Sequence, residues 1–104
     1  MITITPEAAS QIKFSAQQSK AEGMALRIAA TRNSDNSIHY GMGFDDSKEE
    51  DISITSENIE IIVSPESAAL LIDTVLDFVE LEPGNKQFIF LNPGDPNYKP
   101  PLEQ

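Results

Sequence analysis

The chain of 104 residues contains no cysteine. Without thiols it cannot form disulfides, use a thiolate as a nucleophile, or bind zinc or an iron–sulphur cluster through sulfur. It has a single histidine, His39, so histidine-rich metal sites and most histidine-based catalysis are excluded as well. The ligands that this chain can offer a metal ion are therefore mainly oxygen atoms.

Basic residues are also scarce. Seven Lys and Arg stand against seventeen Asp and Glu, which gives a net charge of −10. This charge repels nucleic-acid phosphates and anionic lipids, so we expect neither nucleic acid nor a membrane as a partner. No apolar run approaches the length of a spanning helix, and the first residues lack the basic start of a signal peptide. We therefore expect a cytoplasmic protein.

Short segments with strand-like alternation make up most of the chain, whose length suits one domain. The last two, joined by turn-forming residues at 82–85, contain aromatic residues and are expected to form a hairpin that anchors the core. Strands are predicted at about residues 2–4, 26–30, 38–44, 52–54, 59–63, 75–80 and 87–91. The sequence predicts seven short strands, mostly paired as antiparallel hairpins.

Two segments have the composition of helix starts. Thr5-Pro6-Glu7 and Ser64-Pro65-Glu66 each supply a capping hydroxyl, a proline for the first helical position and an acid for the first turn. The first helix is expected to run to Glu22, with Gly23 at the C′ position, and the second to Ile72. The prediction is a mainly β, α+β domain, a small barrel or sandwich with the helices on one side.

Three segments match motifs of one known family. Residues 70–79 match an L-D-x-x-x-L-D-F-V-like run, and Leu26-Arg27-Ile28 fits an L-R-L-like strand. A strand ending in F-x-F-x-N-P is matched by Phe88, Phe90, Asn92 and Pro93. On these motifs residues 2–93 resemble the A-type iron–sulphur carriers, also called HesB-like proteins. The resemblance implies a distorted antiparallel β-barrel, assembly through the sheets, and a role in iron–sulphur cluster biogenesis. We expect a HesB-like domain at residues 1–93 and a proline-rich, flexible tail at 94–104.

The cysteines of that family have no counterpart in this chain. Aligned without gaps, the cysteine of the family's S-G-C-S-G-like turn falls on Asp35, and those of its C-x-C tail fall at about Lys99 and Pro101. The resemblance therefore implies a member that holds no cluster or other cofactor and is not an enzyme. We expect a protein-interaction or accessory module. Its partner would be a cysteine-containing relative or a client enzyme, and the chain itself would be a homo-oligomer.

The alternative function is binding of a single divalent metal ion. Asp35 is the candidate ligand, joined by His39 or by the acidic connector at residues 45–51. Each also has a simpler interpretation: Asp35 in the run N-S-D-N-S makes a turn, His39 is a solvated strand residue, and the connector is solvated. An enzyme would need a nucleophile or an acid–base pair, and the carboxylates have no recognisable spacing for one.

Gly41-Met42-Gly43 has two of the three glycines of a dinucleotide fingerprint, but no helix is expected after it, so we reject a phosphate cradle. Close backbone packing or a β-bulge is the preferred explanation of these glycines. The tail around Tyr98 is expected to be a loose terminus, with a linear protein ligand as the alternative.

Overall fold

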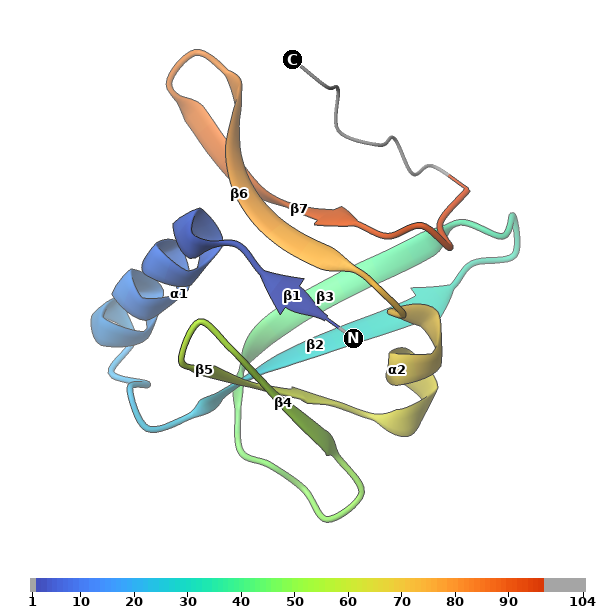
Figure 1. The fold of residues 1–104 in the computed structure, drawn as a ribbon, viewed down its shortest axis with the longest axis horizontal. Coiled ribbons are helices and arrows are strands. Elements are labelled where there is room, and N and C mark those ends of the chain that lie inside the picture. Colours follow the sequence, from blue (N-terminus) through green and yellow to red (C-terminus); the bar gives the residue numbers. More distant parts are fainter. Residues whose placement is uncertain (1, 97–104) are drawn as a thin grey trace.

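The computed structural model describes residues 2–96. Figure 1 shows the arrangement of the strands and helices. Their order and bounds are β1 (Thr3–Ile4), α1 (Pro6–Gln18), β2 (Ala25–Arg32), β3 (Ile38–Asp45), β4 (Ile52–Ser56), β5 (Ile59–Val63), α2 (Pro65–Leu70), β6 (Val75–Glu82) and β7 (Asn85–Leu91). The described chain confirms the expected α+β class with seven strands and two helices.

The strands of the described chain form two sheets, which do not close into a barrel. One sheet has the order β1-β6-β7 and the other β3-β2-β5-β4. Hairpins β2–β3, β4–β5 and β6–β7 are antiparallel as expected, but β1 pairs with β6 and β2 with β5 in parallel. Parallel pairing arises here because these strands are distant in sequence and meet through crossovers, not through tight turns. The expected barrel-like or sandwich arrangement is thus present as two mixed sheets, and the two parallel pairs are the feature that the sequence did not predict.

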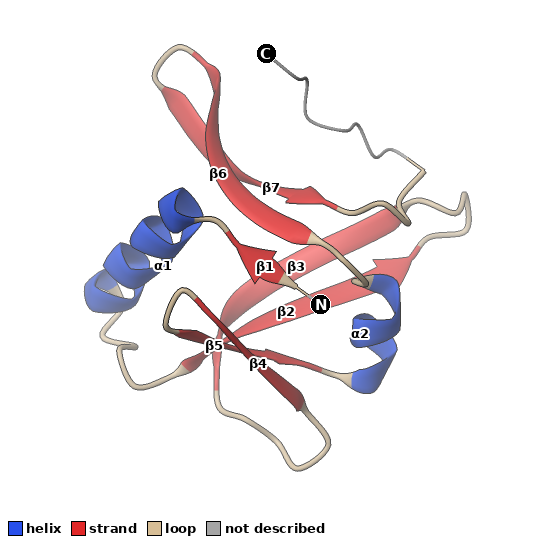
Figure 2. Ribbon diagram, viewed as in Figure 1, coloured by secondary structure: helices blue, strands red, loops and turns tan. Residues whose placement is uncertain are grey.

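In the view of Figure 2, α1 lies at the left of the molecule and α2 at the right. Helix α1 contacts β6, and α2 contacts β2. Among the described residues, neither helix has the length and apolar content that crossing a membrane requires.

The hydrophobic core lies between the two sheets and α1. The most completely buried apolar side chains include Ile4, Ile28, Ile61, Leu71 and Leu76. The β6–β7 hairpin contributes only Leu76 to this fully buried set, while its aromatic residues pack against the core from partly exposed positions. The hairpin is therefore one wall of the core and not its anchor, because aliphatic residues of β2 and β5 occupy the centre.

Helix α1 begins as the sequence predicts and ends earlier. The Thr5 hydroxyl accepts a hydrogen bond from the Ala8 amide (3.2 Å), with proline in the first turn. The helix stops at Gln18 because Lys20 adopts a left-handed conformation with φ of 56°. The Ala21 amide then bonds to the Ala16 carbonyl (2.7 Å), which closes a Schellman motif. Lys20, and not Gly23, is the C′ residue.

Helix α2 is fastened to β2 by one buried hydroxyl. β5 pairs with β2 only at Leu26 and Arg27, which leaves the backbone of Ala30 without a strand partner on that edge. The Ser67 Oγ accepts a bond from the Ala30 amide (3.0 Å) and donates to the Ala30 carbonyl (3.3 Å). Both backbone groups are thus satisfied away from water. This contact positions α2 beside the end of β2 where the next loop begins.

Candidate functional site

The loop between β2 and β3 is closed by its own polar side chains. The Asn33 amide bonds to the Ser37 carbonyl (2.8 Å), and Asn36 has a left-handed conformation with φ of 75°. The Arg32 guanidinium donates to the carbonyl oxygen and to the Oδ1 of Asn36 (2.9 and 3.0 Å). Asparagine and serine favour such turns because their side chains bond locally to the backbone.

Asp35 lies at the exposed tip of this loop. Its Oδ1 accepts hydrogen bonds from the Ser37 hydroxyl (2.5 Å) and the Ser37 amide (3.0 Å). These two bonds lower the pKa of the Asp35 carboxyl, the hydroxyl contributing most, so the group is ionised at neutral pH. The arrangement is an Asx turn, which agrees with the turn-forming interpretation of this residue.

His39 is exposed on β3, where it faces Thr31 of β2 in the strand register. Within residues 2–96, no group of three or more His, Asp or Glu side chains is placed to hold a metal ion. The metal role of Asp35 and His39 therefore stays a prediction from the sequence.

At the same end of β3, Tyr40 joins the sheet to the C-terminal part of the described chain. Its ring stacks on Phe90 of β7 with centroids 4.4 Å apart and planes within 6°. Its hydroxyl donates a hydrogen bond to Asp95 Oδ2 (2.7 Å). Burial, helped by the bond to Asp95, raises the pKa of Tyr40 to about 12, so the neutral phenol is the form that fits this site.

Asp95 belongs to a tight turn that follows β7. The Asp95 amide bonds to the Asn92 carbonyl (3.0 Å), and the Gly94 amide bonds to Asn92 Oδ1 (3.0 Å). The Asn92 side chain is only 1% exposed and donates to the Leu70 carbonyl at the end of α2 (2.7 Å). The first residues of the expected tail thus have defined bonds. Lys99 and Pro101, where the resemblance places the family's paired cysteines, lie outside the described residues.

A pocket of about 300 Å³ connects this turn with the end of β2. It is lined by Arg32, Ala69, Leu70, Ile72, Asp73, Asn92, Pro93 and Gly94. Arg32 adjoins the β2–β3 loop, and Gly94 adjoins Asp95, so the pocket shows that the loop end and the C-terminal turn are neighbours. Figure 1 shows both at the same side of the molecule. The sequence suggested no such contact.

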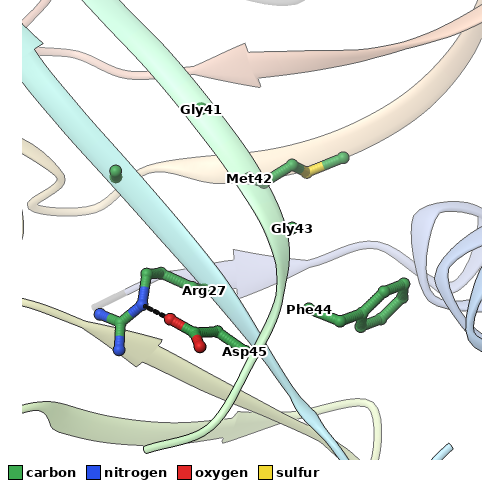
Figure 3. Close-up of a pocket in the computed structure, with 7 residues that line it drawn as sticks. Arg27, Gly41, Met42, Gly43, Phe44 and Asp45 are labelled. Carbon is green, nitrogen blue, oxygen red and sulfur yellow. Dashed lines mark hydrogen bonds and ion pairs between the residues drawn. The ribbon is translucent and has the colours of Figure 1, made fainter. Parts of the chain in front are cut away.

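A second depression, of about 210 Å³, lies along β3 and is shown in Figure 3. Met42 and Phe44 point to one side of the strand, while Arg27 and Asp45 lie on the other. The two glycines of this strand, Gly41 and Gly43, line the depression. Their register with β2 is continuous, and a Cβ added at either one would meet nothing within 4 Å. The expected bulge or close packing was therefore wrong, whereas the absence of a following helix is confirmed.

Arg27 holds the acidic connector against the outer face of this sheet. Its guanidinium makes two bonds to the Asp51 carboxylate (2.9 and 2.6 Å) and one to Asp45 Oδ2 (2.7 Å). The bonds raise the pKa of Arg27, Asp51 contributing most. The pKa of each carboxyl is lowered to about 2, and the bond from Arg27 is the largest cause, followed by a backbone amide of the connector. The Asp51 side chain is only 5% exposed. This part of the connector is an ion-paired cluster and not simply solvated. An arginine between two buried aliphatic residues, Leu26 and Ile28, was the signal that could have revealed it.

Comparison with known proteins identifies relatives over most of the chain. Residues 1–100 match the family described as iron-sulphur cluster biosynthesis. The iron–sulfur cluster insertion protein ErpA of Ruthia magnifica is 30% identical over 93 residues, which cover 88% of this chain and 79% of the relative. ErpA of Haemophilus ducreyi is 31% identical over 93 residues, covering 88% and 81%.

Solved structures share the fold. A crystal structure of IscA with a [2Fe-2S] cluster matches with a TM-score of 0.75 and 25% identity, covering 89% of this chain and 86% of that one. A solution structure of an Aquifex aeolicus protein matches with a TM-score of 0.64 and 30% identity, covering 86% and 89%. The overall fold is thus shared with proteins that are 25% and 30% identical to this chain.

Proposed function

Since this chain belongs to the iron-sulphur cluster biosynthesis family, we propose that it is an accessory member that acts by contact with another protein and holds no cluster through thiolates of its own. One observation carries the proposal. The fold of the cluster-bound IscA is retained, yet this chain of 104 residues has no cysteine. Iron–sulphur clusters in proteins are held mainly by cysteine thiolates, and a single histidine does not replace them.

The β2–β3 loop supports the same conclusion. Asp35 is the residue that the resemblance places at the family's first cysteine, and its Oδ1 is used to close the loop onto Ser37. A loop braced in this way, with Arg32 bonded across it to Asn36, presents a preformed surface. Preformed surfaces suit recognition because little conformational entropy is lost on binding.

Contact with proteins is also supported by exposed apolar side chains. Large hydrophobic residues with more than a third of their surface exposed occur on both sheets, on α1, just before β2 and after α2: Phe14, Met24, Met42, Ile52, Ile72 and Leu81. A homo-oligomer, a cysteine-containing relative or a client enzyme could cover them. A net charge of −10 opposes self-association, so an oligomer of this chain should strengthen with salt. The cytoplasm remains the expected compartment, on family membership alone.

Anaerobic reconstitution tests the non-ligating role directly. The protein is incubated with ferrous iron and sulfide, separated from excess reagents, and examined by visible absorption and iron analysis. We expect no protein-bound cluster, while ErpA of Haemophilus ducreyi, treated identically, serves as the positive control. A stable absorption band from a cluster bound to this chain would refute the proposal.

Restored thiols provide a matched variant in the same scaffold. Cysteines introduced together at Asp35, Lys99 and Pro101 occupy the places that the resemblance assigns to the family's ligands. If the scaffold is intact and only the ligands are missing, the triple variant gains iron and sulfide that the parent chain does not bind. The contact role is then tested by mixing the parent chain with a cysteine-containing relative. The molar mass of any complex is measured by light scattering after size exclusion.

Binding of one divalent ion at Asp35 is the second candidate. It is supported by the exposure of the carboxylate and by its lowered pKa, which keeps it ionised at neutral pH. It ranks second because hard cations take several oxygen ligands and Oδ1 is already engaged by Ser37. Calorimetry with Fe²⁺, Mn²⁺ and Mg²⁺ on the parent chain, Asp35→Ala and His39→Ala decides the matter, since equal heats in all three proteins would end this candidate.

A further inference from the structure

The outer edge of β3 is the longest free strand edge in the described part of the chain. The edge strands of the two sheets are β1, β7, β3 and β4, and β3 is the longest of them with eight residues. One side of β3 pairs with β2 without interruption, whereas no strand within residues 2–96 pairs with its other side. Such an edge presents unused backbone donors and acceptors.

Strand geometry identifies the backbone groups that face outward. The Asn33 amide bonds to the Ser37 carbonyl (2.8 Å), so these residues form a hydrogen-bonded pair at the end of the antiparallel ladder. Hydrogen-bonded and non-hydrogen-bonded pairs alternate, which turns the backbone amides and carbonyls of Met42 and Phe44 away from β2. The Ala30 amide of β2 faces away from β3 and toward α2, as this alternation requires. Met42 and Phe44 are therefore the residues through which a further strand would pair.

This edge has none of the features that normally block strand addition. Edge strands of soluble proteins are protected by proline, by charged side chains or by β-bulges. Residues 38–44 contain no proline and no Lys, Arg, Asp or Glu, and their register with β2 is continuous. Gly41 and Gly43 leave the backbone open, since a Cβ added at either one would meet nothing within 4 Å. An unprotected edge of this length favours pairing with another chain.

Two apolar depressions flank the same part of the edge, one on each face of the sheet. The depression of about 210 Å³ lies on the outer face, over Gly41 and Gly43 (Figure 3). A smaller one, of about 130 Å³, lies on the core face next to Leu26 and Phe88. Phe44 lines both. Successive side chains of an added strand point to opposite faces, so they would enter the two depressions in turn.

The charge at the end of β3 favours a basic partner. The connector at residues 45–51 contains five carboxylates and one lysine, and Arg27 is bonded to two of the carboxylates. An excess of negative charge therefore lies beside the end of the strand. The net charge of −10 opposes a second copy of this chain at the same place, whereas a basic segment is attracted by the same field.

We propose that the free edge of β3 receives an extended segment of a partner protein as an added strand, with apolar residues at alternate positions and Lys or Arg beside the acidic connector. The inference deepens the proposed function, on which its biological use rests, because it names the contact surface and the chemistry of the partner. Backbone bonds to Met42 and Phe44 provide affinity, and the two depressions select the side chains. An antiparallel strand has its N-terminal end beside Asp45, so the basic residues precede the apolar ones.

A synthetic peptide tests this edge on the full chain. The probe has two lysines followed by alternating threonine and valine, and its control is the same peptide with N-methyl groups on the residues that would donate to β3. Hydrogen exchange of the Met42 and Phe44 amides, followed by NMR, reports pairing. We expect saturating probe to slow this exchange about tenfold, as for the gain of one backbone hydrogen bond, and the N-methylated peptide to leave it unchanged.

Variants of the chain test the depressions and the free amide separately. Gly43→Leu fills the outer depression and should weaken binding of the probe about tenfold by calorimetry, because one side chain of the peptide loses its site. Gly23→Leu is the matched control, since a Cβ there also meets nothing within 4 Å and Gly23 lines neither depression. Met42→Pro removes one outward N–H at an edge position that tolerates proline, and it should abolish binding. Glutamates in place of the lysines of the probe should weaken binding at low salt.

Three results would overturn the proposal: no binding of the probe, equal binding of the N-methylated peptide, or binding that leaves the exchange of Met42 and Phe44 unchanged. Protection of these amides without peptide, rising with protein concentration, would assign the edge to a second copy and overturn it as well. The experiment uses no iron, sulfide or cysteine-containing relative. A chain that fails it and still forms a complex with its relative keeps the proposed function, so the two failures are distinguishable.

Discussion

Thr74 offers the sharpest test of the packing between α2 and β6. Its side chain is 1% exposed, and within the described part of the chain its Oγ1 has no hydrogen-bond partner. Its backbone is fully used, since the amide bonds to the Leu71 carbonyl (3.2 Å) and the carbonyl accepts from Thr3 (3.0 Å). The hydroxyl is therefore a buried polar group with no hydrogen-bond partner among the described protein atoms.

Replacing this hydroxyl by a methyl group should stabilise the protein. An unsatisfied buried hydroxyl costs about 1–3 kcal/mol, and valine has nearly the same shape as threonine. We therefore expect Thr74→Val to raise the free energy of unfolding by about 1–2 kcal/mol. For a domain of this size each kcal/mol corresponds to about 4–8 °C in Tm.

Urea and thermal unfolding followed by circular dichroism measure this change. Thr74→Ser keeps the hydroxyl and removes the methyl, so it should lower the free energy of unfolding by about 1 kcal/mol. Thr55→Val, on the exposed side of β4, should stay within about 0.5 kcal/mol of the parent chain. If Thr74→Val destabilises the protein as much as Thr74→Ser, the hydroxyl has a partner and the reasoning is wrong.

Three other predictions concern the ion pairs of Arg27, the phenol of Tyr40 and a comparison of two glycines. The two carboxyls bonded to Arg27 have pKa values lowered to about 2, below the ordinary 3.9, so their stabilising effect is present above pH 4 and is lost as the pH falls toward 2. In Arg27→Gln, the free energy of unfolding, measured with urea across that pH window, should fall by less than it does in the parent chain. The pKa of Tyr40 is raised to about 12, so its contribution to the free energy of unfolding is fully present below pH 10 and is lost between pH 10 and 12. Tyr40→Phe should abolish this loss. Gly41→Val should stabilise by about 0.5–1 kcal/mol, because a strand position with open space gains from a β-branched residue. Gly84→Val should destabilise by more than that, since φ there is +78°, and thermal unfolding compares the two.

Local signals in the sequence predicted the elements well and their ends less well. Both helix starts were correct, because a capping hydroxyl followed by proline and an acid acts within four residues. The predicted end of α1 was wrong because a residue other than glycine can adopt the left-handed conformation when the hydrogen bonds of a Schellman motif compensate its cost, and here Lys20 does so. β2 extends to Arg32, beyond the expected end, because pairing with Ile38 continues the ladder into a polar stretch.

The candidate site was predicted only in part. Asp35 as a turn-forming residue follows from its neighbours, since an Asx turn spans only two residues. The Tyr40–Asp95 bond joins residues 55 positions apart, and the Arg27–Asp51 pair spans 24. No local pattern specifies such partners, because several acidic residues were available for each.

By itself, the sequence determined that the protein has no thiol ligands, which family it resembles and where most of its strands lie. Composition and short-range periodicity need no knowledge of distant neighbours. The tertiary structure alone decided that the strands form two sheets that do not close into a barrel, that two pairs of strands run parallel, and that the C-terminal turn contacts β3. These features depend on contacts between remote segments, where burial and the satisfaction of backbone hydrogen bonds select one partner among many that the sequence allows.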